Sequence, residues 1–539
     1  MNQKTFEIQK KYLFFPIGVN EPLVKVFLSR GGEAMYDLDL RLSENPDFYT
    51  WLDTETLKGK NLTLSSDCDA ALLDRIRERD ELPDDVYREK LRPRVHYTPM
   101  RGWVNDPNGL VWHEGKYHLF YQHNPYDIRW GNMHWGHAES PDLIHWREVG
   151  EALYPDGDGT MFSGSAVVDK ENVTGLGNGN EPALLLFYTA AGGSNSASEG
   201  KKYTVCMAYS LDNGKTFVKF AGNPVLDNLV YGNRDPKVFW HEKSGRWCMI
   251  LFMYEYKFAF FSSEDLLHWT FESEGAFPTM NECPEVFELA DTGKWVILAG
   301  ADYWGDQSVG KYYIGSFDGR EFVKEDGPYP IDFGKSFYSL QTFENDPKGR
   351  RILMGWRTCN FHMPNKNGMP FNGEFSIPTE IRPCTIDSKL RIARYPVEEF
   401  FRARTEGRSE FTLRNVDAVK IDRLVFEDEC PFVAVEFEAE IADNAIVEFD
   451  MGGVSVYYHS ETQTLQAFGN NIKIPLEDGK LSVLLIRDTM SLELYVQGGK
   501  YPVCGYAEFT KDENTVTAYR GTLKHMRICS RHLKSIWEK

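Results

Sequence analysis

Three acidic residues stand in local sequences that could support chemistry. Asp106 lies in WVNDPNG, Asp235 in YGNRDPKVFW and Glu282 in MNECPEVFEL. In each segment the acid comes just before a proline and the start of an apolar, strand-like run. Carboxylates that gather in one pocket cannot all ionise freely, so at least one pKa rises. One protonated and one ionised carboxyl are what the cleavage of a glycosidic bond requires.

Each of the three acids also has a purely structural interpretation. An Asp-Pro pair is common in turns, and the Asn, Asp, Pro and Gly around Asp106 are typical of a tight bend. Asp235 could form a surface ion pair with Arg234, which contributes little stability. Glu282 could simply be exposed to solvent. Three such segments, interleaved with aromatic residues, nevertheless favour a shared site.

The segment YQHNPYDIRWGNMHWGHA at 121–138 favours a sugar as the ligand. Flat aromatic faces stack on sugar rings, while amides and imidazoles bind hydroxyls. His134 and His137 fall on opposite faces of a strand-like segment without an evident carboxylate partner, so we expect no metal site. FSGSAV, with Ser163 and Ser165, lacks the GxSxG pattern, which argues against a serine hydrolase.

The elements that must position these residues are short strands arranged in weak repeats. SPDLIHW at 140–146 returns as SEDLLHW at 263–269, and looser copies are SLDNGKTF at 210–217 and SFDGREF at 316–322. With the segment 336–394, about five units are present. Repeats of several strands predict propeller blades, although a sandwich with coincidental turns is an alternative. The innermost strands of a propeller surround one channel, so the three acids would converge there.

The remaining segments predict further β-rich bodies. After residue 405, runs such as VAVEFEAEI alternate apolar and polar residues, which is typical of a two-sheet sandwich. The sequence therefore predicts an all-β protein with four parts in order: an N-terminal β-rich module at 1–68, a helical connector at 69–93, a propeller at 94–395 and a C-terminal sandwich at 405–539.

Composition excludes several classes of partner. The formal net charge of -20 makes nucleic acid and anionic membranes poor partners. No run approaches the roughly 20 apolar residues of a membrane-spanning helix. The N-terminus shows no apolar region typical of a signal peptide, and the nine cysteines are scattered without CxxC pairs, so we expect a reduced, cytoplasmic protein.

The sequence resembles glycoside hydrolase family 32, the fructosidase and invertase family, over about residues 94–539. The segments that carry the resemblance include HYTPMRGWVNDPNGL, WGNMHWGHAESPDLIHW, MFSGSAVVD, RDPKVFW, ECPEVFEL and DFGKSFYSLQTF. Many ordered segments make this resemblance specific. It implies a five-bladed β-propeller followed by a β-sandwich, and retaining hydrolysis of terminal β-fructofuranosyl bonds in sucrose, fructo-oligosaccharides, inulin or levan.

The resemblance also implies roles for individual residues. Asp106 matches the nucleophile, Glu282 the general acid/base and Asp235 the transition-state stabiliser that holds fructose hydroxyls. Positions expected to bind the substrate are Asn105, Gln122, Trp130, Phe162, Ser163, Arg234, Cys283 and Trp356. No cofactor and no metal are implied, and the expected partner is a small-molecule or oligosaccharide fructoside.

The sequence departs from the family pattern at two positions. Val104 replaces a methionine after the tryptophan, which keeps the position apolar, and Thr379 replaces a basic residue, which could remove an ion pair. Residues 1 to about 90 lie outside the core pattern and resemble a β module found before some bacterial members. The loops at 301–310 and 361–372 are expected to affect linkage preference.

Three other functions compete with an exo-acting fructosidase. A fructosyltransferase would use the same residues with a sugar as the acceptor. A sugar-binding protein would have an inactive site, which the presence of all three acids disfavours. An enzyme that cleaves arabinan or xylan would share the propeller, but the Arg-Asp-Pro and Glu-Cys motifs argue against it.

Overall fold

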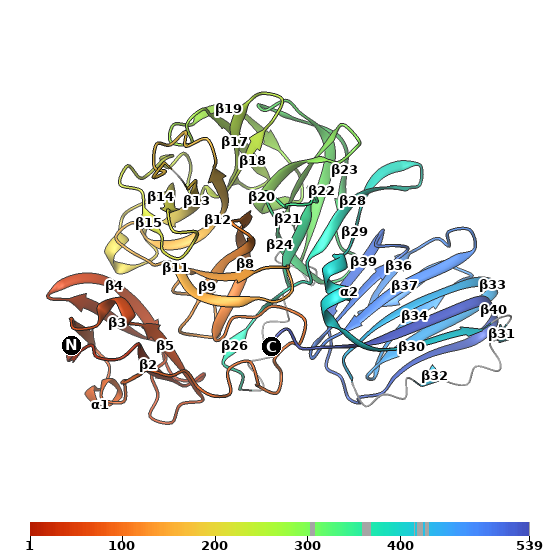
Figure 1. Cartoon of the computed structure of the whole chain (residues 1–539), viewed down its shortest axis with the longest axis horizontal. Helices are drawn as coiled ribbons and strands as arrows, with labels where there is room; N and C mark the ends of the chain where they lie inside the picture. Colours follow the sequence, from red (N-terminus) through yellow and green to blue (C-terminus); the bar gives the residue numbers. More distant parts are fainter. Residues whose placement is uncertain are drawn as a thin grey trace.

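The computed structural model describes residues 1–537 apart from Asn180 and the segments 302–307, 358–367, 414–415, 418–423 and 426–430. The described chain is almost entirely β and forms three bodies in sequence order (Figure 1): an N-terminal module, a propeller and a sandwich. No helix in the described part of the chain has the length and apolar character needed to cross a bilayer.

The N-terminal module consists of two small sheets around one apolar core. The first sheet has the order β1 (Asn2–Glu7), β6 (Asn61–Ser66), β3 (Val24–Arg30) and β4 (Glu33–Leu40), and the second has β5 (Phe48–Asp53), β2 (Tyr12–Ile17) and β7 (Arg77–Arg79). A short 3₁₀ helix, η1 (Glu55–Leu57), follows β5. The core contains Leu13, Phe15, Leu38 and Leu64, none of which is exposed to solvent.

The connector differs from its predicted helical form. Only α1 (Ala70–Leu73) is α-helical within 69–93, and Arg77–Arg79 instead forms β7, which pairs with Tyr12–Phe14 of β2. The segment Arg77–Arg79 pairs with a strand that lies some 60 residues earlier in the chain, and the local sequence gives no sign of this pairing. The hydrogen bonds of the sheet therefore outweigh the local helical propensity of the connector.

The propeller has five blades, and each blade has four main strands, which are given below in order from the innermost to the outermost. The first blade has β8 (Gly102–His113), β9 (Lys116–Asn124), β10 (His134–Ser140) and β11 (Arg147–Leu153), and the second has β12 (Thr160–Asp169), β13 (Ala183–Ala191), β14 (Tyr203–Ser210) and β15 (Val218–Lys219). The third blade has β16 (Arg234–His241), β17 (Arg246–Tyr254), β18 (Lys257–Ser263) and β19 (Thr270–Ala276), and the fourth has β20 (Met280–Leu289), β21 (Lys294–Ala301), β22 (Ser308–Phe317) and β23 (Phe322–Pro330). The fifth blade has β24 (Ser336–Thr342), β25 (Ile352–Arg357), β28 (Thr379–Ile386) and β29 (Lys389–Pro396).

Short segments complete the propeller. β26 (Phe371–Asn372), from the fifth blade's part of the chain, pairs with β8 of the first blade and so closes the ring, while β27 (Glu374–Phe375) pairs with β25. A 3₁₀ helix, η2 (Ser196–Ser198), lies between β13 and β14.

The four repeated motifs follow the third strand of the first four blades, as a propeller requires. Each motif holds an aspartate, namely Asp142, Asp212, Asp265 and Asp318, that accepts two backbone N–H bonds of its own turn at 2.8–3.1 Å. Aspartate is favoured in turns because its short side chain can bond the backbone one to four residues further on. The repeat is therefore a turn motif that reverses the chain toward the outermost strand of each blade.

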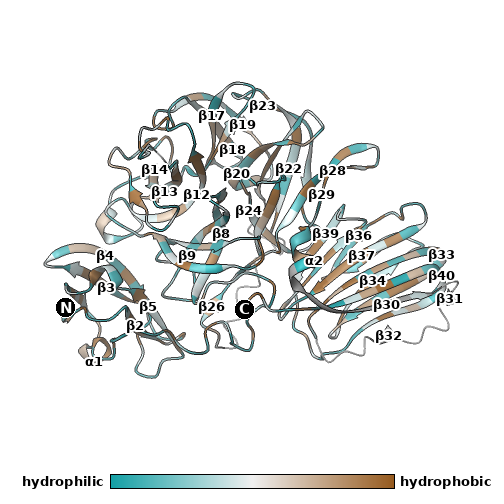
Figure 2. Cartoon of the chain, viewed as in Figure 1, coloured by the Kyte–Doolittle hydropathy of each residue, from teal (hydrophilic) through white to brown (hydrophobic). Residues whose placement is uncertain are grey.

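The C-terminal sandwich follows the helix α2 (Glu398–Arg404). Its strands are β30 (Thr405–Leu413), β31 (Val416–Asp417), β32 (Leu424–Val425), β33 (Val433–Met451), β34 (Val454–His459), β35 (Thr464–Ala467), β36 (Asn470–Lys473), β37 (Lys480–Arg487), β38 (Ser491–Val496), β39 (Tyr501–Tyr506) and β40 (Asn514–Leu533). Figure 2 shows hydrophobic and hydrophilic residues alternating along these strands. Along β33, Val435, Phe437 and Ala439 enter the core, because successive side chains point to opposite faces.

A buried charge cluster joins the propeller to the sandwich. His96 lies 2.7 Å from a carboxylate oxygen of Asp488 and 3.1 Å from one of Glu493, and Arg357 also lies 3.1 Å from Glu493. Burial lowers the pKa of His96, but Glu374, Asp488 and Glu493 together raise it to about 9. A charged His96 therefore pairs with the sandwich across this interface.

Candidate active site

The five innermost propeller strands are all irregular near their beginnings. Their pairing with the second strands shifts between Val104 and Pro107, Phe162 and Gly164, Arg234 and Lys237, Asn281 and Glu285, and Tyr338 and Gln341. Three residues at these shifts, Asp235, Cys283 and Ser339, have positive φ angles of 62°, 53° and 48°. A β-bulge re-aims side chains, and such backbone strain persists only where surrounding contacts hold it.

The NDPNG segment is one of these bulges, which corrects the interpretation of it as a tight bend. β8 continues from Gly102 to His113 through the segment, with register shifts on both sides of Pro107 and Asn108. Residues typical of turns also suit a β-bulge, because the backbone of a bulge departs from extended dihedral angles as a turn does. Proline is tolerated in a bulge because the ladder of hydrogen bonds between the strands is interrupted there. Asp106 thus lies on an innermost strand rather than in a loop.

Asp106 contacts side chains from two other blades. Its Oδ2 atom accepts a 2.5 Å hydrogen bond from the Ser163 hydroxyl on β12 and lies 3.5 Å from the Cys283 sulfur on β20. Cys283 also donates its backbone N–H to Oδ2 of Asp235 at 3.0 Å. One residue of the fourth blade therefore bridges two acids that are 129 residues apart in the sequence.

Glu282 is held by two side chains from other strands. Its Oε1 atom accepts a 2.7 Å bond from Nη2 of Arg234, and its Oε2 atom accepts a 2.8 Å bond from the Tyr338 hydroxyl. Arg234 Nε also lies 3.7 Å from Oδ2 of Asp235. The Arg234 guanidinium therefore lies close to both Asp235 and Glu282. Asp106, Asp235 and Glu282 thus lie near one another, as the propeller interpretation predicted.

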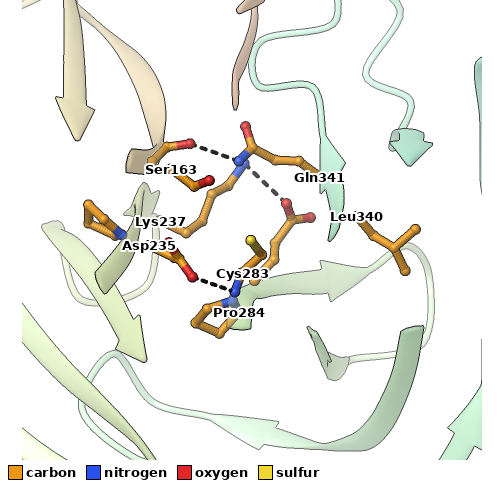
Figure 3. A pocket seen from close by; sticks show the side chains of 10 residues that line it. Ser163, Asp235, Lys237, Cys283, Pro284, Leu340 and Gln341 are labelled. Atoms are coloured by element: carbon orange, nitrogen blue, oxygen red, sulfur yellow. Dashed lines mark hydrogen bonds and ion pairs between the residues drawn. The ribbon is translucent and has the colours of Figure 1, made fainter. Parts of the chain in front are cut away.

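A small pocket lies among the innermost strands and is lined by Ser163, Asp235, Cys283 and Gln341 (Figure 3). Figure 3 shows Asp235 and Cys283 joined by their hydrogen bond. Further along the same strands, the buried Lys237 ammonium lies 3.2 Å from both Glu285 and Glu344. Lys237 and Glu285 line the same pocket as Asp235.

The pKa of one of the three acids is raised, chiefly by burial and further by the neighbouring carboxylates. Burial raises the pKa of Asp235 to about 7; Arg234 lowers it, while the charges of Glu282 and Asp106 raise it further. Asp235 is 6% exposed, so water does little to stabilise its charge. The raised pKa thus belongs to the acid that lies deepest between the other two.

We expect Asp235→Asn to stabilise the fold, and increasingly so at higher pH. The folded pKa of about 7 exceeds the ordinary value of 3.8, so the parent binds an extra proton when folded between these values and loses stability as pH rises through them. The amide has no such cost, and its advantage should grow by on the order of 2–3 kcal/mol between pH 5 and 8.

Thermal unfolding of parent and variant at pH 5 and pH 8 checks this expectation. The matched variant Asp265→Asn, in an exposed blade turn, should show no such growth, because the pKa of Asp265 is lowered instead by the bonds of its turn despite partial burial. A stability difference for Asp235→Asn that stays constant or shrinks toward pH 8 would contradict the assignment.

The other residues predicted to bind substrate lie around these acids. Asn105 accepts a 2.8 Å bond from the Trp103 indole, and Trp103 packs edge-on against Trp356 at 5.6 Å. Gln122 on β9 faces the bulge at Asp106, because its neighbours pair with Val104 and Pro107. Among the described residues, Nε2 of Gln122 and Nε1 of Trp356 are buried without a hydrogen-bond partner. Orphaned buried donors fit a site for a hydroxyl-rich ligand.

The structure adds three residues that the sequence interpretation did not single out. Tyr338 binds Glu282, Ser339 lies 3.7 Å from the Cys283 sulfur, and the Thr189 hydroxyl accepts the backbone N–H of Asp235 at 3.0 Å. None stands beside an acid and a proline in the sequence, so the pattern that revealed the carboxylates could not reveal them. The repeat could have suggested Tyr338 and Ser339, which occupy the bulge of the fifth innermost strand.

The surroundings of His137 differ from the sequence-based expectation that no carboxylate lies near it. His137 does have a carboxylate near it: with His118 and Glu139 it forms a buried group whose possible ligand atoms lie within 4.8 Å of one another. The two imidazoles bond each other at 3.0 Å, and Glu139 accepts 2.8 Å bonds from Lys116 and Arg147. These contacts already neutralise and orient the group. His134 lies apart from it, against Tyr36, Tyr126 and Tyr154.

The structure describes Thr379, but it leaves out most of the two loops that were expected to affect linkage preference. Thr379 is buried, and its hydroxyl donates a 3.4 Å bond to the Leu353 carbonyl, which gives it a role in pairing β28 with β25. Most of the two loops expected to affect linkage preference, residues 302–307 and 361–367, lies outside the described residues.

Comparison with known proteins agrees with the geometry. Residues 96–394, more than half of the chain, match the family model "Glycosyl hydrolases family 32 N-terminal domain". A levanase of Bacillus subtilis (strain 168) is 39% identical over 338 residues, which cover 59% of this chain and 49% of the levanase. The chain thus spans about half the length of that relative.

Solved structures share the fold. The exo-inulinase from Aspergillus awamori superposes with a TM-score of 0.74 at 25% identity, covering 84% of this chain and 100% of the other. A glycoside hydrolase family 32 structure from Bifidobacterium adolescentis covers 100% of both chains with a TM-score of 0.68 at 21% identity. The second match extends the shared fold to the N-terminal module.

Proposed function

Because the chain belongs to glycosyl hydrolase family 32, we propose that it releases terminal β-D-fructofuranosyl units from fructans, fructo-oligosaccharides or sucrose. The convergence of Asp106, Asp235 and Glu282 on three innermost strands carries this proposal. The levanase and exo-inulinase similarities support fructosides as the substrate class. A neutral, polyhydroxylated substrate also suits the net charge of -20.

In the first step, Asp106 attacks the anomeric carbon of the terminal fructose. Within the described contacts, Oδ2 of Asp106 is engaged by Ser163 and Cys283, which leaves Oδ1 to form the new bond. Glu282 gives its proton to the glycosidic oxygen as the bond to the leaving sugar breaks. The products are the departed sugar and a fructosyl ester of Asp106.

In the second step, water resolves the ester with net retention. Glu282, now a carboxylate, takes a proton from water as the water oxygen attacks the same carbon and Asp106 departs. Arg234 and Tyr338 hold both oxygens of Glu282 in place through each proton transfer. Asp235 lies beside both acids, where it can bind fructose hydroxyls through the oxocarbenium-like transition state.

A product time course tests the proposal. We expect the parent to release free fructose one unit at a time from sucrose, 1-kestose, inulin and levan given separately, with relative rates that rank the linkages. Fructosylated products at high sucrose concentration would identify transfer instead of hydrolysis. No fructose from any of the four, with a folded protein, would overturn the proposal.

We also propose that the protein resides in the cytoplasm. The seven cysteines in the described part of the chain are free thiols, Cys68, Cys206, Cys248, Cys283, Cys384, Cys504 and Cys529. Free thiols, several of them buried, support a reducing compartment. Fractionation of the source cells into cytoplasm and medium, with detection of the native chain, tests this proposal.

A further inference from the structure

The loop between β9 and β10 is built into the N-terminal module rather than resting beside it. Tyr126 and Ile128 of this loop are fully buried and belong to the module's own apolar core. The Tyr126 ring meets Phe15 of β2 edge-on at 5.8 Å. Figure 1 shows the module packed beside the first blade, next to β9 and β11. The core of the module is therefore complete only with propeller side chains in it.

Polar contacts anchor the same loop on either side of its apolar residues. Arg41 at the end of β4 donates a 2.9 Å bond to the buried Asp127 carboxylate. Arg129 donates a 2.8 Å bond to the backbone carbonyl of Val19. An ion pair with one buried partner is costly to break, because it leaves an unpaired charge out of water.

Asn132 forms a pair of hydrogen bonds between the loop and the module. Its amide accepts the Asp39 backbone N–H at 2.8 Å and donates to the Asp39 carbonyl at 2.9 Å, as a neighbouring strand would. Asn132 has a positive φ of 41°. A non-glycine residue keeps this conformation only where its contacts hold it, so the bonds to Asp39, together with a 3.2 Å bond to the Asn124 side chain, fix the local course of the loop.

Trp130 lies between these anchors and faces solvent. Its side chain is 57% exposed, although its ring contacts Phe162 edge-on at 5.8 Å. Phe162 directly precedes Ser163, which binds Asp106, and also contacts Tyr203 at 5.4 Å. An exposed indole in a loop held from both ends is suited to stacking on a sugar ring, because it need not lose freedom on binding.

The structure assigns the N-terminal module a role in substrate binding: through Asn132, Arg41 and the shared core it holds Trp130 as a fixed wall at the mouth of the site. This inference rests on the proposed function, since the ligand of the wall is the fructoside. Asn132 and Arg41 are positioning residues that act through Trp130. The module thereby affects substrate affinity without contributing a reacting group.

The variant Asn132→Ala tests this role through the division between KM and kcat. It removes both bonds to Asp39 and a 3.2 Å bond to the side chain of Asn124 within the first blade. We expect KM for 1-kestose to rise about tenfold while kcat changes less than about twofold, because a mobile indole loses stacking in the ground and transition states alike. The matched control is Ser196→Ala, which removes a 3.2 Å side-chain bond to Asp37 of the module from a different propeller loop. It should leave KM unchanged.

A double-mutant cycle with Trp130→Ala separates positioning from a general loss of structure. If Asn132 acts through Trp130, adding Asn132→Ala to Trp130→Ala should not raise KM further. An equal KM increase in both backgrounds, a loss confined to kcat, or an unchanged KM in Trp130→Ala would each overturn the inference while leaving the proposed function intact.

Hydrogen exchange of the intact proteins tests the anchoring without substrate. Backbone amides of residues 126–132 should exchange faster in Asn132→Ala, and also in Arg41→Ala, than in the parent and in Ser196→Ala, because local opening becomes easier. Arg41→Ala removes the module's ion pair with the loop and leaves the loop's own bonds in place, so it isolates the contribution of the module. Unchanged exchange in this loop would overturn the inference. A parent that cleaves no fructoside would instead overturn the proposed function and with it the ligand assigned to Trp130, while the exchange data would still decide whether the module anchors the loop.

Discussion

Replacing Asp106 with asparagine is expected to lower kcat/KM for fructosides by at least about a thousandfold, because the amide cannot form the covalent bond to the anomeric carbon. Asparagine has nearly the same shape and can still accept the 2.5 Å bond from Ser163. The variant should therefore fold normally, and its loss of activity should reflect chemistry alone.

Initial rates on sucrose and inulin, with thermal unfolding as a check of the fold, measure this effect. The matched control is Asp265→Asn, the same chemical change in a turn of the third blade, where the described contacts of the carboxylate all lie within residues 263–268. Activity of Asp106→Asn within about tenfold of the parent would remove Asp106 as the nucleophile.

Replacing Glu282 with alanine is expected to slow the cleavage of natural fructosides by about a hundredfold to ten-thousandfold, the usual contribution of a general acid. A leaving group that departs without a proton does not need this acid. An activated aryl β-fructofuranoside should therefore form the fructosyl-enzyme at close to the parental rate, and only the second step should stay slow.

The ratio of rates on the aryl substrate and on sucrose is the quantity to compare between variant and parent. Added azide supplies a nucleophile that needs no general base, so it should accelerate Glu282→Ala and give a fructosyl azide of retained configuration. Equal losses on both substrates, or an azide product of inverted configuration, would show that Glu282 is not the acid/base.

The raised pKa of Asp235 illustrates a cost built into the site. Three acids and one guanidinium occupy neighbouring positions on the innermost strands, and burial together with two neighbouring negative charges raises the pKa of Asp235 to about 7. The backbone at Asp235, Cys283 and Ser339 is held at positive φ. Such strain and charge crowding are typical of functional sites, where a preorganised environment stabilises the transition state rather than the fold.

The sequence by itself determined the architecture and indicated which acids are the candidates for the reacting groups. The aspartates of the repeated motifs bond their own turns, so the information for each blade's return is local and survives in a single sequence. Alternation along 433–440 likewise indicated a sandwich strand from local residues alone. The acids were visible because each stands one or two residues before a proline near the start of an apolar strand, and the structure places all three at β-bulges.

Only the tertiary structure decided how those groups act together. The hydrogen bonds that hold the acids join residues 46 to 177 positions apart, among them the Cys283 contacts to Asp235 and Asp106 and the Tyr338 bond to Glu282. Local patterns carry no record of such pairs, which is also why the connector's strand and the anchoring of Trp130 were not predicted. Which acid has the raised pKa depends on burial and on the distances between charges, and both exist only once the blades have closed into a ring.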